Sequence, residues 1–169
     1  MATAAGSTDA ATIGRAYFEA VADRDVDAMV ALWEPGGIDE LHGLASLRAP
    51  DQIREWFGDV FAAVPDCRFE VLDLLAGGDK VAVRWQMTGS FVGDARFEGL
   101  IATGAGIEIT GCDVLTVRDG KIQHNDAYMN GAQMARQVGA LPPQGSLPER
   151  AMTAALNLRT RAARRLGRR

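Results

Sequence analysis

The sequence predicts an α+β fold in which helices cover one face of a strongly curved antiparallel or mixed sheet. Up to about residue 64, apolar residues recur at helical spacing, whereas beyond that point apolar and polar residues alternate as they do in strands. The strand-rich half also contains Asp119-Gly120 between two alternating arms, which is a strong hairpin signal. Helices segregated from antiparallel strands are typical of α+β domains. A curved sheet covered by helices leaves a pocket between them, and such pockets are common ligand sites.

Three helices are expected in the first part of the chain. The first carries an apolar stripe at residues 13, 17, 18 and 21, and the second covers about residues 25–33. Pro35-Gly36-Gly37 should end the second helix, and residues 38–48 are expected to form an irregular extended segment. The third helix begins after Ala49-Pro50 and ends before Pro65. Its apolar stripe is the most continuous of the three and consists of Ile53, Trp56, Phe57, Val60, Phe61 and Val64.

Extended segments are expected at residues 69–74, 81–88, 91–102 and 107–117, and the second arm of the hairpin completes the series. A short helix should follow at residues 132–138 and end at Gly139. These boundaries divide the chain into a loose N-terminal tail (residues 1–9), one domain (residues 10–143) and a basic helical extension (residues 144–169).

The composition is that of an ordinary globular protein. A chain of 169 residues can bury a substantial core as one domain without disulfides or a metal. The first residues are small and polar, unlike a signal peptide, and no apolar run is long enough to cross a membrane. Cys67 and Cys112 lack the spacing of metal ligands, so we expect two buried free thiols and a cytoplasmic protein.

The charge is distributed unevenly along the chain. Residues 1–149 carry 22 acidic and 11 basic side chains, whereas residues 150–169 carry seven arginines and no acid. The acidic body argues against a nucleic-acid partner, and a membrane partner is not expected. The tail could be a basic amphipathic helix that docks on the acidic body, a partner or a membrane surface. A helix packed on its own domain with a solvated end is the alternative, and we favour it.

The hairpin brings candidate catalytic residues together. If Asp119-Gly120 is the loop, Asp113 faces Asp126, Leu115 faces His124, and Tyr128 lies on the same side. Two facing carboxylates on an apolar face repel each other, so one must stay protonated or share its charge with His124. Active sites obtain an acid and a base at neutral pH in this way. The alternatives are that this face is wet and the aspartates are solvated, or that a one-residue bulge separates the pair.

The order of elements, together with several short segments, resembles the NTF2-like superfamily and in particular its SnoaL-like polyketide cyclase group. The resemblance covers about residues 10–143. It is carried by ALWEPGG at 31–37, FEGL at 97–100 with TG at 103–104, GCDV at 111–114, RDGKI at 118–122, ARQVG at 135–139 and LPP at 141–143.

The resemblance implies a cone-shaped fold, a mostly apolar pocket that holds an acid/base Asp or His, and a homodimer packed through the sheet. SnoaL-like cyclases work without cofactor or metal and use one aspartate to move a proton at an activated carbon. Family aspartates of the last strand would fall near Ala127 and Asn130, so Asp126 matches only after a one-residue slip. The epoxide-hydrolase relatives need an Arg-x-Asp, and Arg84-Trp85-Gln86 lacks that carboxylate.

Other candidate residues are weighed against structural roles. Asp39 lies where isomerase and pyran-forming cyclase relatives place a catalytic aspartate, although an Asp after two glycines is commonly a turn residue. His42 could face solvent or the pocket. Tyr17 and Tyr128 could donate to an oxyanion, and Asn130 could orient a carbonyl or cap a helix. Trp33, Trp56, Trp85, Met87 and Phe97 are candidate substrate-binding residues, with core packing as the alternative.

The sequence therefore leaves two main alternative functions. The first is a cofactor-free cyclase or isomerase that acts on a polyketide-like or other apolar carbonyl compound, with Asp113, Asp126, His124 and Asp39 as its acid/base groups. The second is a non-catalytic module of the same fold that holds a small apolar ligand or a protein. In the second case the aspartates should be exposed at the rim of the pocket or engaged by arginine, with ordinary pKa values. A third hypothesis makes the arginine tail the working part and the cone a dimerising scaffold.

Overall fold

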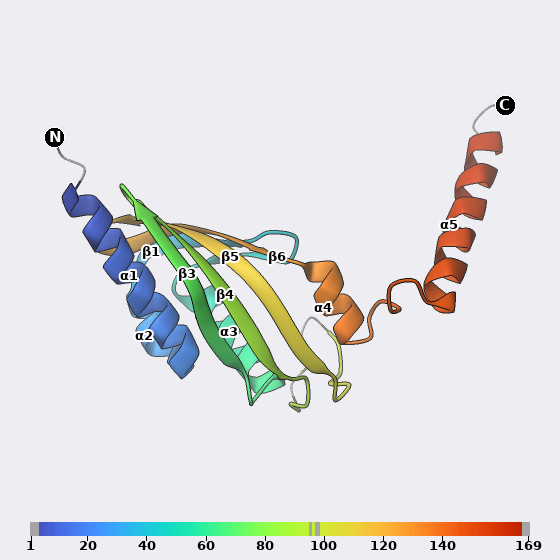
Figure 1. The fold of residues 1–169 in the computed structure, drawn as a ribbon, viewed down its shortest axis with the longest axis horizontal. Helices are drawn as coiled ribbons and strands as arrows, with labels where there is room; N and C mark the ends of the chain where they lie inside the picture. Colours follow the sequence, from blue (N-terminus) through green and yellow to red (C-terminus); the bar gives the residue numbers. More distant parts are fainter. Residues whose placement is uncertain (1–3, 95, 97–98, 167–169) are drawn as a thin grey trace.

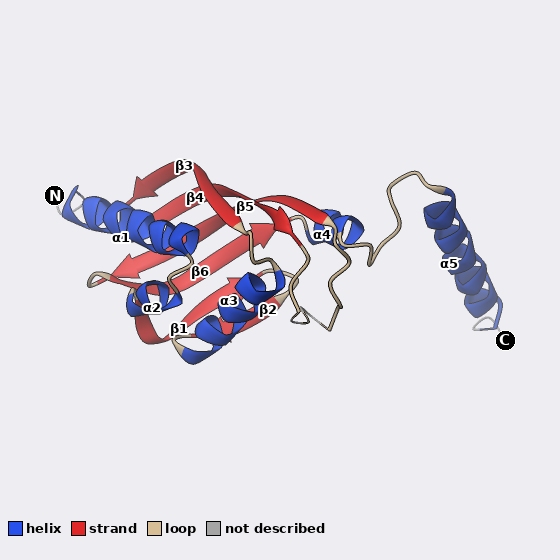
Figure 2. Cartoon of the chain, turned by 90° about the horizontal axis from the view of Figure 1, so that it is seen from below, coloured by secondary structure: helices blue, strands red, loops and turns tan. Residues whose placement is uncertain are grey.

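The computed structural model describes residues 4–94, 96 and 99–166, with only the backbone described for residues 4–9. In this part of the chain, six strands form one mixed sheet in the order β2-β1-β6-β5-β4-β3 (Figure 1). The helices α1, α2 and α3 lie on one face of the sheet (Figure 2). This arrangement confirms the predicted α+β fold with helices over a curved sheet.

Helix α1 (Ala4–Asp23) and helix α3 (Asp51–Ala63) present apolar stripes to the sheet, as their spacing predicts. Helix α2 (Val26–Ala31) is short and begins at Asp25, whose carboxylate accepts a hydrogen bond from the Ala28 backbone N–H at 2.9 Å. The expected loose tail at residues 1–9 is wrong for residues 4–9, because α1 already begins at Ala4. This stretch contains alanines, which favour helix.

The strands are β1 (Trp33–Leu41), β2 (Ala45–Arg48), β3 (Arg68–Gly77), β4 (Lys80–Ser90), β5 (Gly106–Arg118) and β6 (Lys121–Met129). Residues 38–48, expected to be irregular, instead form most of an antiparallel β1–β2 pair. Pro35-Gly36-Gly37 does not end a helix but lies inside β1, where the pairing with β6 shifts between Trp33 and Ile38. The described part of residues 91–102 is a loop rather than a strand.

The β5–β6 hairpin turns at the predicted residues. Asp119 and Gly120 have φ angles of 51° and 71°, which are the two positive values that a type I′ turn needs. Beyond this turn β6 pairs with β5 on one side and runs parallel to β1 on the other. The parallel pairing places the last strand of the sheet beside the first.

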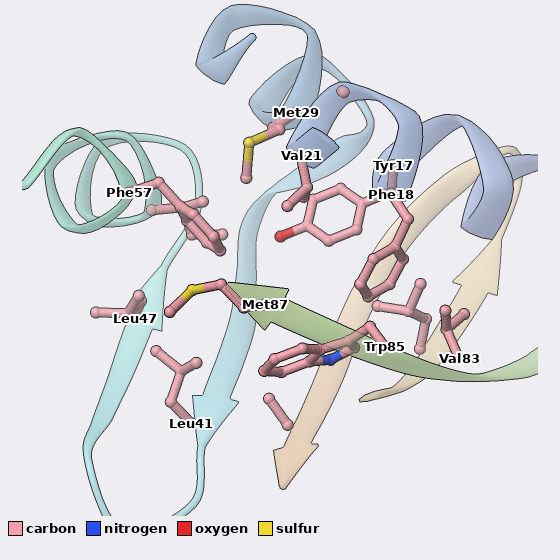
Figure 3. Close-up of a cluster of buried hydrophobic side chains, with 14 of the residues drawn as sticks. Tyr17, Phe18, Val21, Met29, Leu41, Leu47, Phe57, Val83, Trp85 and Met87 are labelled. Atoms are coloured by element: carbon pink, nitrogen blue, oxygen red, sulfur yellow. The ribbon is translucent and has the colours of Figure 1, made fainter. Parts of the chain in front are cut away.

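The hydrophobic core fills the space between the helices and the sheet. Tyr17 and Phe18 of α1 point toward Trp85 and Val83 of β4, and Phe57 of α3 approaches Met87 (Figure 3). All six of these side chains are buried. Cys67 and Cys112 are both free thiols, as expected, but only Cys67 is buried, whereas Cys112 is partly exposed. Burial raises the pKa of Cys67 to about 11.

Helix α4 (Gly131–Gln137) closes one end of the sheet, close to the predicted helix at residues 132–138. Helix α5 (Leu147–Leu166) stands apart from the body (Figures 1 and 2), and none of its residues is buried. Leu156, Leu158 and Leu166 are 60–74% exposed. The favoured packing of the tail on its own domain is therefore wrong. None of the helices in the described residues is both long and apolar enough to span a membrane.

Candidate active site

A small apolar cavity lies between the helices and the sheet. Its volume is about 100 Å³, and its walls come from α1, α3, α4 and the concave face of the sheet. Among the described residues, the ionisable side chains that line it are Tyr17 of α1, Asp39 of β1 and Asp113 of β5. Carboxyl groups are rarely found in so apolar a place without a partner, so these three groups mark the cavity as a candidate site.

Asn125 of β6 joins the two acids. Its side-chain nitrogen Nδ2 donates one hydrogen bond to Asp39 Oδ1 at 2.9 Å and a second to Asp113 Oδ2 at 2.8 Å. The three side chains are almost completely buried, with exposed fractions of 1% for Asp39, 7% for Asp113 and 1% for Asn125. Three neighbouring strands, β1, β6 and β5, thus contribute one member each to a buried polar cluster.

Burial controls the protonation of both acids. Desolvation, together with the nearby charge of Asp113, raises the pKa of Asp39 to about 7, although the Asn125 hydrogen bond opposes the rise. Desolvation also raises the pKa of Asp113 to about 6, against the hydrogen bonds from Trp85 and Asn125. At neutral pH the pair can therefore hold one proton, which fits an acid and a base in one pocket.

Trp85 of β4 orients Asp113. Its indole Nε1–H donates to Asp113 Oδ1 at 2.7 Å, so Asp113 accepts one bond from Trp85 and one from Asn125. The indole lies against Gly111, its partner across the β4–β5 pair. A Cβ atom at Gly111 would lie 2.3 Å from Trp85 Cζ2, so the absence of a side chain there makes room for the ring.

Tyr17 brings a hydroxyl to the same cavity. The ring is 1% exposed, and its oxygen points into the space between the helices and the sheet (Figure 3). Burial raises the pKa of Tyr17 well above its ordinary value, and the charges of Asp39 and Asp113 raise it further. The Trp33 indole N–H lies near the hydroxyl and opposes this rise in pKa. In the described structure, however, neither the Tyr17 hydroxyl nor the Trp33 N–H has a partner within hydrogen-bonding geometry. The hydroxyl is thus protonated and available to a ligand.

The hairpin register differs from the predicted one. Asp113 pairs with Ala127 and Leu115 pairs with Asn125, because the pairing shifts by one residue between Thr116 and Val117. Gln123 is the extra residue of this bulge. The expected pairing of Asp113 with Asp126 is therefore wrong. The bulge turns Asn125 inward and places Asp126, His124 and Tyr128 on the outer face of the sheet, away from the cavity.

The outward residues form a cluster of their own. Asp126 Oδ1 lies 2.9 Å from His42 Nε2 and 3.4 Å from His124 Nε2, and the side chains of all three are 31–41% exposed. The His42 hydrogen bond is the main reason why the pKa of Asp126 is lowered. Tyr128, half exposed, stacks on the His42 ring with 4.3 Å between ring centroids. His42 therefore faces solvent, which was one of its two expected positions.

The remaining candidate residues lie in different places. Trp56, Trp85 and Met87 line the cavity, whereas Trp33 is buried in the core outside the cavity lining. Asn130 caps α4, where its side-chain oxygen accepts a hydrogen bond from Gln133 N at 3.0 Å. Phe97 lies outside the described residues. Among those described, no group of three or more His, Cys, Asp or Glu side chains is arranged to hold a metal ion.

Comparison with known proteins identifies the family. The family model of the SnoaL-like domain matches residues 14–125, which is more than half of the chain, so this protein belongs to the SnoaL-like domain family. No curated protein sequence matches the chain. The match includes Asp39, Asp113 and Asn125 but ends before Asp126.

Solved structures share the fold at low sequence identity. AclR from Streptomyces galilaeus, a proposed hydroxylase, is 19% identical over 94% of this chain and 97% of its own, with a TM-score of 0.69. A proposed SnoaL-like polyketide cyclase from Jannaschia sp. CCS1 is 18% identical over 82% of this chain and 97% of its own, with a TM-score of 0.72. A protein with a ketosteroid isomerase-like fold from Catenulispora acidiphila is 18% identical over 78% of this chain and 97% of its own, with a TM-score of 0.63. These similarities confirm the NTF2-like fold.

Proposed function

We propose that this protein is an acid/base enzyme, a SnoaL-like isomerase or cyclase that forms an enolate from an apolar carbonyl compound without a cofactor. The observation that carries the proposal is the pair of buried acids at one apolar cavity, with pKa values of about 7 for Asp39 and about 6 for Asp113. A group whose pKa lies near the working pH is the best compromise for moving a proton in both directions.

Asp39 is the proton carrier in this proposal. Its ionised form removes a proton from the carbon next to the substrate carbonyl, and its protonated form returns that proton elsewhere on the enolate. The Tyr17 hydroxyl, which stays protonated because burial raises its pKa, donates to the enolate oxygen. Return of the proton gives an isomerase. Attack of the enolate carbon on a second carbonyl of the same molecule gives a cyclase, whose rate owes much to holding the two ends together.

The size of the cavity bears on the substrate. A volume of about 100 Å³ is below the roughly 300–1,000 Å³ of most ligand pockets. A polyketide-like substrate therefore requires the cavity to widen. Met87, Met129 and Met134 line it, and methionine side chains change rotamer more easily than branched or aromatic ones. We propose that the substrate is either a small ketone or a larger compound admitted by movement of these methionines.

Proton exchange into small ketones is the direct test. The protein is incubated in D₂O with a panel of apolar ketones and β,γ-unsaturated ketones, and deuterium uptake next to the carbonyl is followed by NMR. We expect Asp39→Asn to lower the exchange rate by about 10²–10⁴-fold and Tyr17→Phe by about 10²–10³-fold.

The matched control is Asp73→Asn. Asp73 forms an exposed ion pair with Arg84, and its loss should leave exchange unchanged. Exchange that depends on Asp126 rather than on Asp39 or Asp113 would contradict the proposal. Binding of ketones without any enzyme-dependent exchange would favour the non-catalytic binding module.

We also propose that two copies associate through the outer face of the sheet. Leu75 of β3 and Tyr128 of β6 are large, project from that face and are 74% and 50% exposed. Sedimentation of the wild-type chain should give a dimer, and the double variant Leu75→Arg/Tyr128→Arg should give a monomer with an unchanged circular dichroism spectrum. A wild-type chain that sediments as a monomer at micromolar concentration would refute this association.

A further inference from the structure

Asn125 lies between two buried acids that belong to the strands on either side of it. β6 runs between β1 and β5, and Asn125 pairs with Asp39 on β1 and with Leu115 on β5. The side-chain amide has two N–H groups, and both are used: Nδ2 lies 2.9 Å from Asp39 Oδ1 and 2.8 Å from Asp113 Oδ2. Because Asn125 is 1% exposed, bulk water cannot replace it as the donor.

We propose that Asn125 and Trp85 are positioning residues of the two acids: Asn125 donates to both, and Trp85, which donates to Asp113 alone, makes them unequal, so that a proton shared by the pair resides on Asp39 and the negative charge on Asp113. Asp39 becomes the base of the proposed function when this proton is lost. Asn125 acts through the two acids and is not assigned a contact with the substrate. The inference deepens the proposed function and rests on it for its catalytic meaning, but the unequal sharing of the proton is a property of the resting protein.

The two acids differ in the number of donors they face. Asp113 accepts from Asn125 and from Trp85 Nε1, which lies 2.7 Å away, whereas Asp39 accepts from Asn125. Hydrogen bonds to a carboxylate stabilise its ionised form and lower its pKa. The acid with two donors is therefore the better place for the negative charge. The pKa values of about 6 for Asp113 and about 7 for Asp39 follow the same order.

The orientation of the Asn125 amide supports this reading. Its carbonyl oxygen Oδ1 is buried and has no hydrogen-bonding partner among the described residues. A reversed amide would place this oxygen against the carboxyl oxygens of Asp39 and Asp113, where it would repel an ionised group. The observed orientation leaves Oδ1 unpaired and satisfies both acids. The hydrogen bonds from its N–H groups to the two acids, and not a bond to its oxygen, therefore fix the orientation of the amide.

In the part of the chain that the structure describes, the charged groups that shift the pKa values of this pair are acidic. The groups that raise the pKa of Asp39 through their charge are Asp113 from β5 and Glu40, the next residue along β1. Tyr17 from α1 faces both acids and remains neutral. Within the described chain, no lysine, arginine or histidine contributes to the pKa shift of either acid. The N–H groups of Asn125 and Trp85 therefore stabilise the single negative charge.

Carboxyl titration of the full-length chain by ¹³C-detected NMR tests the inference without a substrate. Asp39→Asn and Asp113→Asn variants assign the resonances. In the wild type, Asp39 should titrate at the higher pH. Asn125→Leu removes one donor from each acid and leaves Trp85 on Asp113, so both pKa values should rise while Asp39 still titrates at the higher pH. Trp85→Phe removes a donor from Asp113 alone, so the difference should narrow.

The two variants distinguish positioning from packing: Asn125→Leu should raise both pKa values and keep their order, whereas Trp85→Phe should raise that of Asp113 and narrow the difference between the two. The inference is overturned if Asp113 titrates above Asp39 in the wild type, if Trp85→Phe leaves the difference between the two pKa values unchanged, or if Asn125→Leu leaves both pKa values unchanged. Should Asn125→Leu fail to fold, the wild-type order and the Trp85→Phe result still decide. In ketone exchange, the acidic limb of the pH profile should move to higher pH in Asn125→Leu. If the titrations behave as expected but no ketone exchanges, the proposed function fails and the inference stands.

Discussion

Gly111 shows how a residue without a side chain supports the candidate site. Its backbone lies directly under the Trp85 indole, which in turn donates to Asp113. A methyl group at this position would meet ring atoms at 2.3–2.7 Å, far inside van der Waals contact, so the ring would have to move. The hydrogen bond to Asp113 depends on the position of that ring.

We expect Gly111→Ala to destabilise the protein by about 1–3 kcal/mol, which is typical of overpacking, and to raise the pKa of Asp113 because the Trp85 donor is displaced. Thermal unfolding and carboxyl titration measure the two effects. Gly106→Ala is the matched control, because it lies in the same strand and a Cβ atom there would meet nothing within 4 Å. Equal unfolding temperatures for the two variants would contradict the steric argument.

Individual candidate residues were predictable to different degrees. Asp113 can be picked out from its place in the hairpin, Asp39 from the resemblance to the family and Tyr17 as a hydroxyl on an apolar helix stripe, and all three line the cavity. Asn125 could not, because an asparagine is unremarkable in a strand until its neighbours on both sides are known. The departure of β6 from strict alternation, in which Ile122 and Asn125 are both buried with two less buried residues between them, is visible only in the folded sheet.

The β5–β6 hairpin illustrates the limit of register prediction. Its turn follows from Asp119-Gly120, whose backbone conformation is set by local chemistry. The bulge at Gln123 lies only three residues beyond the turn and reverses which residues face inward. Both β1 and β6 are irregular where they pair at this point. The bulge thus reflects a fit to a strand about 90 residues away, which local patterns cannot report.

Helix α5 contributes nothing to the core, so its removal should be nearly neutral for stability. A chain truncated after residue 143 loses the Arg136–Glu149 ion pair, whose nitrogen and oxygen lie 2.9 Å apart, but no buried apolar residue. Such an ion pair contributes up to about 1 kcal/mol. We expect the unfolding temperature to change by less than about 4 °C and ketone exchange to be retained.

Scanning calorimetry and the exchange assay check this expectation. The same truncation tests the hypothesis that the arginine tail is the working part of the protein, because that hypothesis requires the loss of cellular function when the body is intact. A large fall in unfolding temperature would instead show that α5 packs on a body, its own or that of a second copy.

The protein as a whole should become less stable as the pH rises through neutrality. The folded pKa values of Asp39, about 7, and Asp113, about 6, lie above the ordinary value of 3.8. Folding therefore favours their protonated forms. The resulting stabilisation is complete below about pH 4 and is lost as the pH rises through 6 and 7. Asp66, Asp126 and Glu149 have lowered pKa values and act in the opposite sense, mainly below about pH 4.

Asp39→Asn should accordingly stabilise the protein at pH 8 and change its stability little at pH 4, because asparagine resembles the protonated acid. The difference between the two pH values should be on the order of 4 kcal/mol, from the size of the pKa rise. Urea unfolding at pH 4, 6 and 8 measures it, with Asp73→Asn as a surface control. A stability difference that does not vary with pH would show that Asp39 ionises as easily in the folded chain as in the unfolded one.

The overall architecture was more predictable than its details. Helical and strand periodicities are repeated over many residues, so single errors do not change the fold, and the SnoaL-like family assignment agrees with them. The position of α5 and the loop at residues 91–102 were not predictable. Whether an amphipathic helix packs, or an alternating segment pairs, depends on the surface that the rest of the fold leaves open.

The parallel pairing of β1 with β6 has a consequence for the order of folding. The hydrogen bond between Asn125 and Asp39 joins residues 86 positions apart, and the strands on either side of the β5–β6 turn are adjacent. Local hairpins close quickly, whereas contacts between distant segments wait for the chain between them to be ordered. On a ribosome, the cavity therefore cannot acquire its second acid or its amide until Asp113 and Asn125 have emerged. Until then Asp39 belongs to an incomplete sheet, with the edge of β1 open to other chains.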